Sequence, residues 1–146
     1  FAQFINGDGG VEAVRTYRRT FRPNLGKPHP ESAVAIHLIC AETEEEANRI
    51  ASSLDLSLLF MSLGVRFPGI PTIEQAQQYN YTPYDLEVIR HNRNRMIVGS
   101  PEQVKQRLLE LAEAYETNEF IVITITHQME HKLKSYELLS QAFQLA

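Results

Sequence analysis

The stretch NRMIVGSPEQVKQRLLELAEAYETNEFIVITITH, residues 94–127, contains two short apolar runs separated by an amphipathic segment. The runs at 96–98 and 120–125 have the length and composition of strands in a buried sheet. Between them, SPEQ at 100–103 combines a capping hydroxyl, a proline at the first helical position and a glutamine three residues after the cap, which predicts a helix start. The buried face of that helix is expected to consist of Val104, Leu108, Leu111 and Tyr115. A strand, a helix and a strand in this order predict a βαβ unit with parallel strands.

The composition limits the class of protein. The 146 residues, of which 43% are hydrophobic, are enough for one domain, or a fragment of one, with a real core. The net charge of -4 comes from interspersed acidic and basic residues, so we expect no nucleic-acid partner. The single cysteine, Cys40, excludes an internal disulfide and fits the reducing cytoplasm. No apolar stretch reaches the ~18 residues of a membrane span, so we expect no membrane partner.

The rest of the chain continues the alternation of helices and strands. We expect strands near residues 1–5 and 33–40, and helices around 14–21 and 130–143. The run at 33–40 is apolar almost without alternation, which is typical of a strand buried on both faces of a parallel sheet. The chain opens directly on FAQFIN, without an initiator methionine, so we interpret it as a segment of a longer protein.

A long helix and an excursion separate the strand at 33–40 from the one at 96–98. Thr43 and Glu46 match the box in which a hydroxyl and a carboxylate each satisfy a backbone N–H, and the helix is expected to end at Gly64. Residues 64–94 are expected to leave the main framework and to contain one inserted helix that begins at Thr82. The sequence therefore predicts an α/β fold with parallel strands alternating with helices.

The strand ends that lead into helices form the ligand face of such folds. On this face we expect residues 40–43, 99–101 and 124–127, with the loop after FAQFIN. Gly99 and Ser100 precede a helix N-terminus, which could bind an anion such as a phosphate. The simpler interpretation, a helix cap at Ser100, carries more weight because SPEQ starts helices in many proteins and only one glycine is present.

The histidines offer a metal hypothesis and a simpler one. HQMEH at 127–131 matches the H-x-x-E-H pattern of inverted zinc proteases. We do not expect a metal site, because His127 lies where a strand passes into a loop and only Glu137 could follow as a carboxylate ligand. His127 can either contact a ligand or lie in a surface loop. His37, inside the buried strand, is interpreted as a core histidine.

Three quoted segments resemble one known family. RMIVGSPEQVKQRLLELAEAYETNEFIVITITHQMEHKLKSYELLSQAF, residues 95–143, is similar to the closing segment of the bacterial luciferase-like flavin-dependent monooxygenases. GGVEAVRTYRRTFRPN at 9–24 and AETEEEANRIASSL at 41–54 are similar to the same family in the same order. The most specific parts are VGSPEQV at 98–104 and HKLKSYELL at 131–139.

This resemblance implies the C-terminal part of a (β/α)8 barrel of the TIM type. Residues 1–5 would be the end of the fifth barrel strand, and the strands near 33–40, 96–98 and 120–125 the sixth, seventh and eighth. The cofactor implied is reduced FMN, which would meet O2 and a small organic substrate in a cytoplasmic homo-oligomer. No catalytic motif of the family can be placed on this chain. By position, the resemblance implies that Phe4, Ser100 and His127 bind the cofactor.

A second function remains open: a stand-alone α/β module that binds a ligand or a partner without catalysis. The reading frame upstream of Phe1 separates the two. A further half-barrel there would favour the monooxygenase, because such barrels run to about 250 residues. The substrate and the catalytic residues are not predicted by this sequence, and the isolated chain is expected to be inactive.

Overall fold

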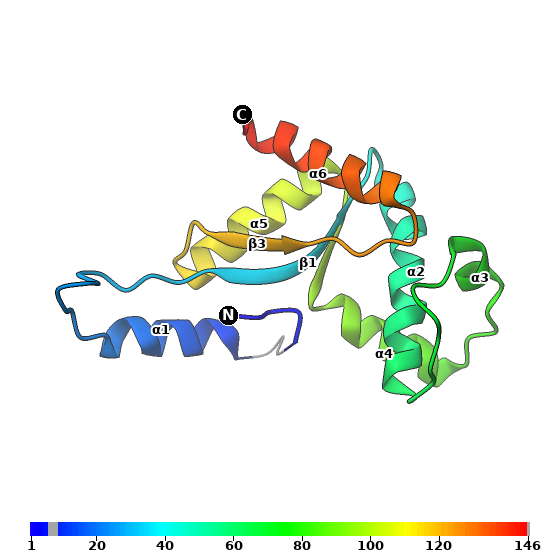
Figure 1. The fold of residues 1–146 in the computed structure, drawn as a ribbon, viewed down its shortest axis with the longest axis horizontal. Coiled ribbons are helices and arrows are strands. Elements are labelled where there is room, and N and C mark those ends of the chain that lie inside the picture. Colours follow the sequence, from blue (N-terminus) through cyan, green and yellow to red (C-terminus); the bar gives the residue numbers. More distant parts are fainter. Residues whose placement is uncertain (6–8, 146) are drawn as a thin grey trace.

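The computed structural model describes residues 1–5 and 9–145, which form a parallel sheet with helices around it (Figure 1). The strands are β1 (Val34–Cys40), β2 (Met96–Gly99) and β3 (Phe120–Ile123). The helices are α1 (Gly10–Thr20), α2 (Glu44–Ser62), α3 (Ile73–Gln78), α4 (Pro83–Arg93), α5 (Pro101–Tyr115) and α6 (Met129–Phe143). The predicted fold class is confirmed. The loop after FAQFIN, assigned above to the ligand face, includes residues 6–8, which lie outside the described residues.

The strand order is β2-β1-β3, and both pairings are parallel. β2 pairs with the second half of β1, from His37 opposite Met96 to Cys40 opposite Gly99. β3 pairs with the first half of β1, from Val34 to His37. The seven-residue strand β1 therefore pairs with two shorter strands, β3 along its first half and β2 along its second half.

The N-terminal residues contribute a bridge to this sheet. Ala2 pairs in parallel with Ala35, whose N–H donates to Phe1 O at 2.8 Å and whose carbonyl accepts from Gln3 N at 2.9 Å. Ala41 N–H donates to Gly99 O, and residues 35 and 41 direct their backbone groups to the same edge because these groups alternate along a strand. Residues 1–3 and β2 thus follow one another along one edge of β1, and β3 lies on the other.

This arrangement corrects two expectations. Residues 1–5 form a single bridge and a turn rather than a strand. Residues 96–99 are a strand, but they do not lie between the strands at 34–40 and 120–123, as consecutive sixth, seventh and eighth barrel strands would. Residues 1–3, which precede β1 in the chain, and β3, which follows it, pair with the first half of β1 on opposite edges. β2 is an additional strand that pairs with the second half of β1.

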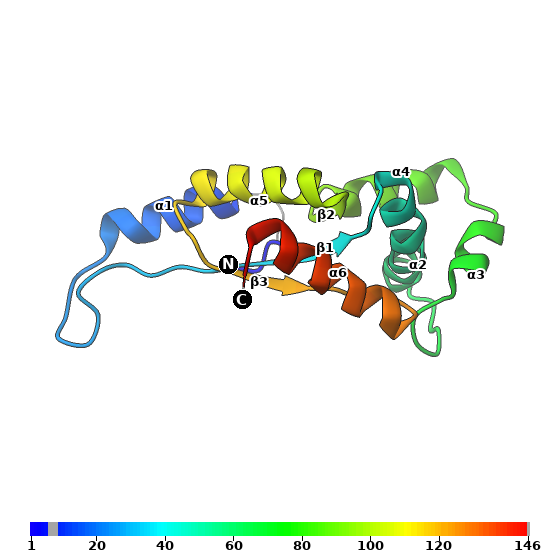
Figure 2. The same ribbon diagram turned by 90° about the horizontal axis from the view of Figure 1, so that it is seen from above.

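Helices cover the sheet on both faces. Ile36, Leu38 and Cys40 pack with residues of α5 and α6, whereas Ile39 and Ala41 pack with α2. Figure 2 shows α2, α3 and α4 grouped at one end of the molecule, with α5 and α6 beside the strands. The N-terminal part of β1 has no such cover on the side of Ile121, whose side chain is 55% exposed.

The excursion at 64–94 is more helical than expected. Besides α4, which starts after Thr82 as predicted, it contains α3, which begins with a capping box between Thr72 and Gln75. At α2 the Thr43 hydroxyl accepts from Glu46 N as predicted. The Glu46 carboxylate does not return to the backbone, because it accepts two hydrogen bonds from Arg49 at 2.7 Å. Among the described residues, no helix is both long and apolar enough to cross a membrane.

Candidate functional site

Ser100 is the N-cap of α5. Its hydroxyl accepts from Gln103 N at 3.5 Å and donates to Glu102 Oε2 at 3.0 Å, and Gln103 Oε1 accepts from Ser100 N at 2.9 Å. Contacts with its own backbone N–H and with the Ser100 hydroxyl lower the pKa of Glu102. A carboxylate of the chain therefore already occupies the position of an anion at this helix N-terminus. The predicted cap is confirmed, and a role of Ser100 in cofactor binding stays a prediction.

Gly99 does not open this helix N-terminus to a ligand. A Cβ at position 99 would lie 2.7 Å from Gln103 Oε1 and 3.1 Å from Gln103 Cβ. The absent side chain therefore makes room for the capping glutamine.

His127 follows β3 and is exposed. Its Nδ1 lies 2.7 Å from Ile70 O, and because a carbonyl only accepts, Nδ1 carries the proton in this contact. The ring lines a hollow of about 250 Å³ together with Arg49, Thr72, Ile73, Glu74, Gln128 and His131. Glu74 in this hollow has a lowered pKa, from its own backbone N–H and the Thr72 hydroxyl first and from Arg49 and His127 further. The hollow thus holds both signs of charge.

The described residues do not support the zinc hypothesis. Within residues 1–5 and 9–145, no group of three or more His, Cys, Asp or Glu could hold a metal ion. His131 lines the same hollow as His127, but Glu130 is exposed on α6 and is not part of that lining.

Phe4 lies against His37, with their ring centroids 5.0 Å apart. His37 is only 8% exposed, and its Nδ1 lies 3.4 Å from Ile123 O. Burial lowers the pKa of His37, and Arg95 lowers it further, although the contact with Ile123 acts in the opposite direction. Phe4 and His37 therefore form an aromatic pair on the face of β1 opposite α5 and α6.

Arg95, which the sequence analysis did not select, lies beside this pair. It directly precedes Met96, the residue opposite His37 in the sheet, and its Nη1 donates to Ile5 O at 2.9 Å. A cation just before a strand is a common surface feature, and no motif marks it. Its role depends on long-range structure, because the N-terminal segment and β2 lie on the same edge of β1 and Arg95 connects them.

The three residues predicted to bind the cofactor are not in one cluster. Phe4 lies near the middle of β1, Ser100 after β2 and His127 after β3, and no hydrogen bond or ring contact found among the described residues joins them. A larger cavity of about 520 Å³ lies between α2, α4 and β2. Its lining is Asn48, Asp55, Leu86, Ile89, Arg90, Arg93, Met96 and Val98.

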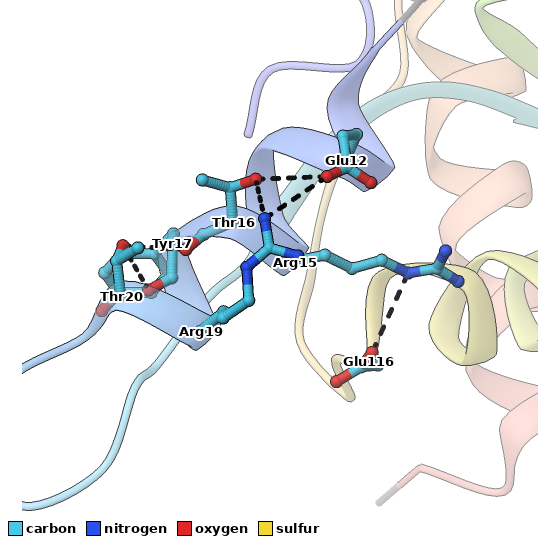
Figure 3. A network of polar contacts seen from close by, with 7 residues as sticks. All are labelled: Glu12, Arg15, Thr16, Tyr17, Arg19, Thr20 and Glu116. Carbon is cyan, nitrogen blue, oxygen red and sulfur yellow. Dashed lines mark hydrogen bonds and ion pairs between the residues drawn. The ribbon is translucent and has the colours of Figure 1, made fainter.

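A separate polar network lies on α1, away from the strand ends (Figure 3). Arg19 contacts Glu12 at 3.8 Å, and Arg15 reaches across to Glu116 at 3.9 Å. All four side chains are at least half exposed, at 51% to 70%. Exposed ion pairs of this kind lie in water on the helix surface and add little to stability. We therefore do not count this network as part of the candidate site.

A parallel sheet with covering helices and polar residues after its strand ends defines an α/β protein with a ligand face at that end. Comparison with known proteins narrows this class. No protein-family profile matches the chain. The uncharacterised protein YwcH of Bacillus subtilis is 50% identical over 98% of this chain and 43% of its own length. The N-acetyl-S-alkylcysteine monooxygenase of the same organism is 34% identical over 97% of this chain and 42% of its own length.

Solved structures of similar fold also match nearly the whole of this chain. The crystal structure of apo-MsnO8 matches with a TM-score of 0.86 and 33% identity, over 99% of this chain and 44% of that one. The FMN-containing oxygenating constituent of 3,6-diketocamphane monooxygenase from Pseudomonas putida matches in fold, with a TM-score of 0.51 and 17% identity over 96% of this chain and 44% of that one. Among the sequence relatives, a luciferase-like monooxygenase of Escherichia coli is 22% identical over 94% of this chain and 41% of its own length. The resemblance to luciferase-like monooxygenases is therefore confirmed along nearly the whole chain, which spans about 43% of the length of YwcH.

Proposed function

We propose that the chain is the C-terminal part of an FMN-dependent monooxygenase that uses reduced flavin and O2 on a small organic substrate. The observation that carries this proposal is the 34% identity to the N-acetyl-S-alkylcysteine monooxygenase over 97% of the chain. The match to an FMN-containing monooxygenase of similar fold supports the choice of flavin. The proposal extends to a cytoplasmic homo-oligomer in which the remaining part of the barrel supplies the catalytic residues.

The sheet order supports a place at the end of the barrel. Residues 1–3, β1 and β3 are neighbours in chain order, as successive strands of a (β/α)8 barrel are. With β3 as the eighth strand, β1 is the seventh and residues 1–3 belong to the sixth. β2 and helices α2 to α4 then form an insertion after the seventh strand.

The side chains near β1 fit a planar cofactor. Phe4 offers an aromatic ring beside His37, and Arg95 Nε is buried without a hydrogen-bond partner. Phe4 would contact the flavin ring, while Ser100 and His127 would lie at the mouth of the barrel. Bound FMN would supply the oxygen chemistry, and the chain would position it and exclude water from the ring.

The test compares the chain with the complete reading frame that contains it. Titration with FMN, followed by flavin fluorescence, should give clear binding for the complete protein and weak binding for the 146-residue chain. Oxygenated product from a panel of thioethers and ketones, supplied with reduced FMN and O2, should form only with the complete protein. A reading frame that starts just before Phe1, or submicromolar FMN binding by the short chain, would instead favour the stand-alone ligand-binding module.

A further inference from the structure

The described residues contain three buried side-chain nitrogen atoms without a hydrogen-bond partner: Arg18 Nε, Asn92 Nδ2 and Arg95 Nε. Two of them lie close together in the sequence, where α4 ends and β2 begins. Asn92 is 6% exposed. Buried polar groups in folded proteins nearly always have a partner, so two unpartnered ones at one place call for an explanation.

Both free groups are hydrogen-bond donors. The Asn92 Oδ1 accepts from Arg95 Nη2, and this bond fixes the orientation of the amide, because the guanidinium can only donate. The amide nitrogen of Asn92 is therefore the free atom. Arg95 Nη1 is used by Ile5 O, which leaves Nε. The missing partner must be an acceptor.

An aromatic pair lies near Arg95, which in turn binds Asn92. Ile5, which Arg95 binds, follows Phe4, and the Phe4 ring lies against His37. Met96, which follows Arg95, is the sheet partner of His37. Three segments that are far apart in the sequence thus bring together an aromatic ring, an imidazole and two N–H donors. This combination suits a planar ring whose edge carries carbonyl oxygens or acceptor nitrogens.

We propose that Asn92 and Arg95 bind the acceptor edge of the flavin ring, the part with its two carbonyl groups, while Phe4 and His37 contact the ring itself. This inference rests on the proposed flavin-dependent function and adds to it the residues that hold the ring. A guanidinium at this edge also favours the reduced flavin, which carries more negative charge than the oxidised form.

The sharpest test is Asn92→Asp in the complete protein. The carboxylate has the shape of the amide and keeps an acceptor for Arg95, but it replaces the free donor with an oxygen. We expect the FMN dissociation constant to rise by about tenfold or more, since a hydrogen bond is lost and two acceptors face each other. The reduction potential of bound FMN should fall. The matched control is Asn94→Asp, which adds the same charge at an exposed position two residues away.

Each outcome decides the inference. Unchanged FMN affinity and potential in Asn92→Asp would overturn it and assign the free donors to ordered water. A higher KM for substrate without a change in FMN affinity would overturn it in favour of a substrate site. If Asn92→Asp does not fold, Arg95→Lys, which keeps the charge and removes Nε, should weaken FMN binding, and unchanged binding would overturn the inference. A wild-type protein that does not bind FMN would overturn the proposed function as well.

Discussion

Two arginines of α1, Arg15 and Arg19, have different surroundings from Arg93 at the end of α4. On α1, Arg15 and Arg19 reach exposed glutamates at 3.9 and 3.8 Å (Figure 3). At the end of α4, Arg93 donates two hydrogen bonds to Asp55 at 2.7 and 2.8 Å. The side chains of Arg93 and Asp55 are only 23% and 8% exposed.

The difference shows that burial, not residue type, determines what an arginine contributes. Water screens the α1 pairs, so they add little to stability. The Asp55 carboxyl is largely buried, and this burial raises its pKa even though Arg93 acts to lower it. The Arg93–Asp55 pair therefore has a high desolvation cost, and each member needs the other. It also joins α4 to α2, with Arg93 Nη1 donating to Asn48 Oδ1 at 3.2 Å.

The largest effect is expected for Arg93→Met. The change leaves Asp55 buried without its cation, which typically costs about 3 kcal/mol or more in the free energy of unfolding. Urea unfolding of the complete protein, followed by circular dichroism, measures it. The double variant Arg93→Met with Asp55→Leu should recover much of the loss, because it leaves no buried charge. A loss below about 1 kcal/mol for Arg93→Met would mean that Asp55 is better solvated than its burial indicates.

Local features of the fold were predictable from the sequence, and long-range ones were not. Thr43, Thr82 and Ser100 were identified as caps because a cap depends on residues within one turn. The box at Thr72 was missed because α3 has only six residues and shows no helical period. The order β2-β1-β3 depends on which edge of β1 each segment reaches, and no local pattern encodes that.

The candidate site was less predictable than the fold, because it too depends on contacts between segments that are far apart in the sequence. Ser100 and His127 were placed after strand ends from the element order alone. Asn92 and Arg95 have no motif, and only one of the contacts that define their free donors is tertiary, the bond from Arg95 to Ile5 O; the bond between Arg95 and Asn92 is local. His37 was correctly interpreted as buried, but its contact with Phe4 could not be deduced from sequence spacing.

A smaller effect is expected for Ser100→Ala. The variant loses the hydroxyl that accepts from Gln103 N, which should cost about 1 kcal/mol in the free energy of unfolding. If Ser100 only caps α5, the FMN dissociation constant of the folded complete protein stays unchanged. A weaker affinity in the fully folded variant would add the cofactor role that the family resemblance implies. Ser100→Thr, which keeps a capping hydroxyl, is the control.

The buried His37 should give a pH dependence. Because burial holds its pKa below the ordinary value, the unfolded chain takes up the proton more readily than the folded one. This contribution is fully present above the ordinary histidine pKa of about 6.5 and is lost as the pH falls through the folded pKa. Urea midpoints at pH 7.5 and 5.5 should therefore differ less in His37→Asn than in the wild type. His91→Asn, at an exposed position, serves as the comparison, and equal pH dependence in wild type and His37→Asn would contradict the expectation.

The smallest effect is expected for Arg19→Met on α1. Arg19 is 70% exposed, and its nitrogen lies 3.8 Å from Glu12, so the free energy of unfolding should change by no more than about 0.5 kcal/mol. Methionine keeps the helix propensity and the length of the side chain. Unfolding in low and high salt should give the same small difference, because little attraction is left for salt to screen. A loss comparable to that of Arg93→Met would show that the α1 network is not simply solvated, and that this helix has a partner covering its arginines in the complete protein.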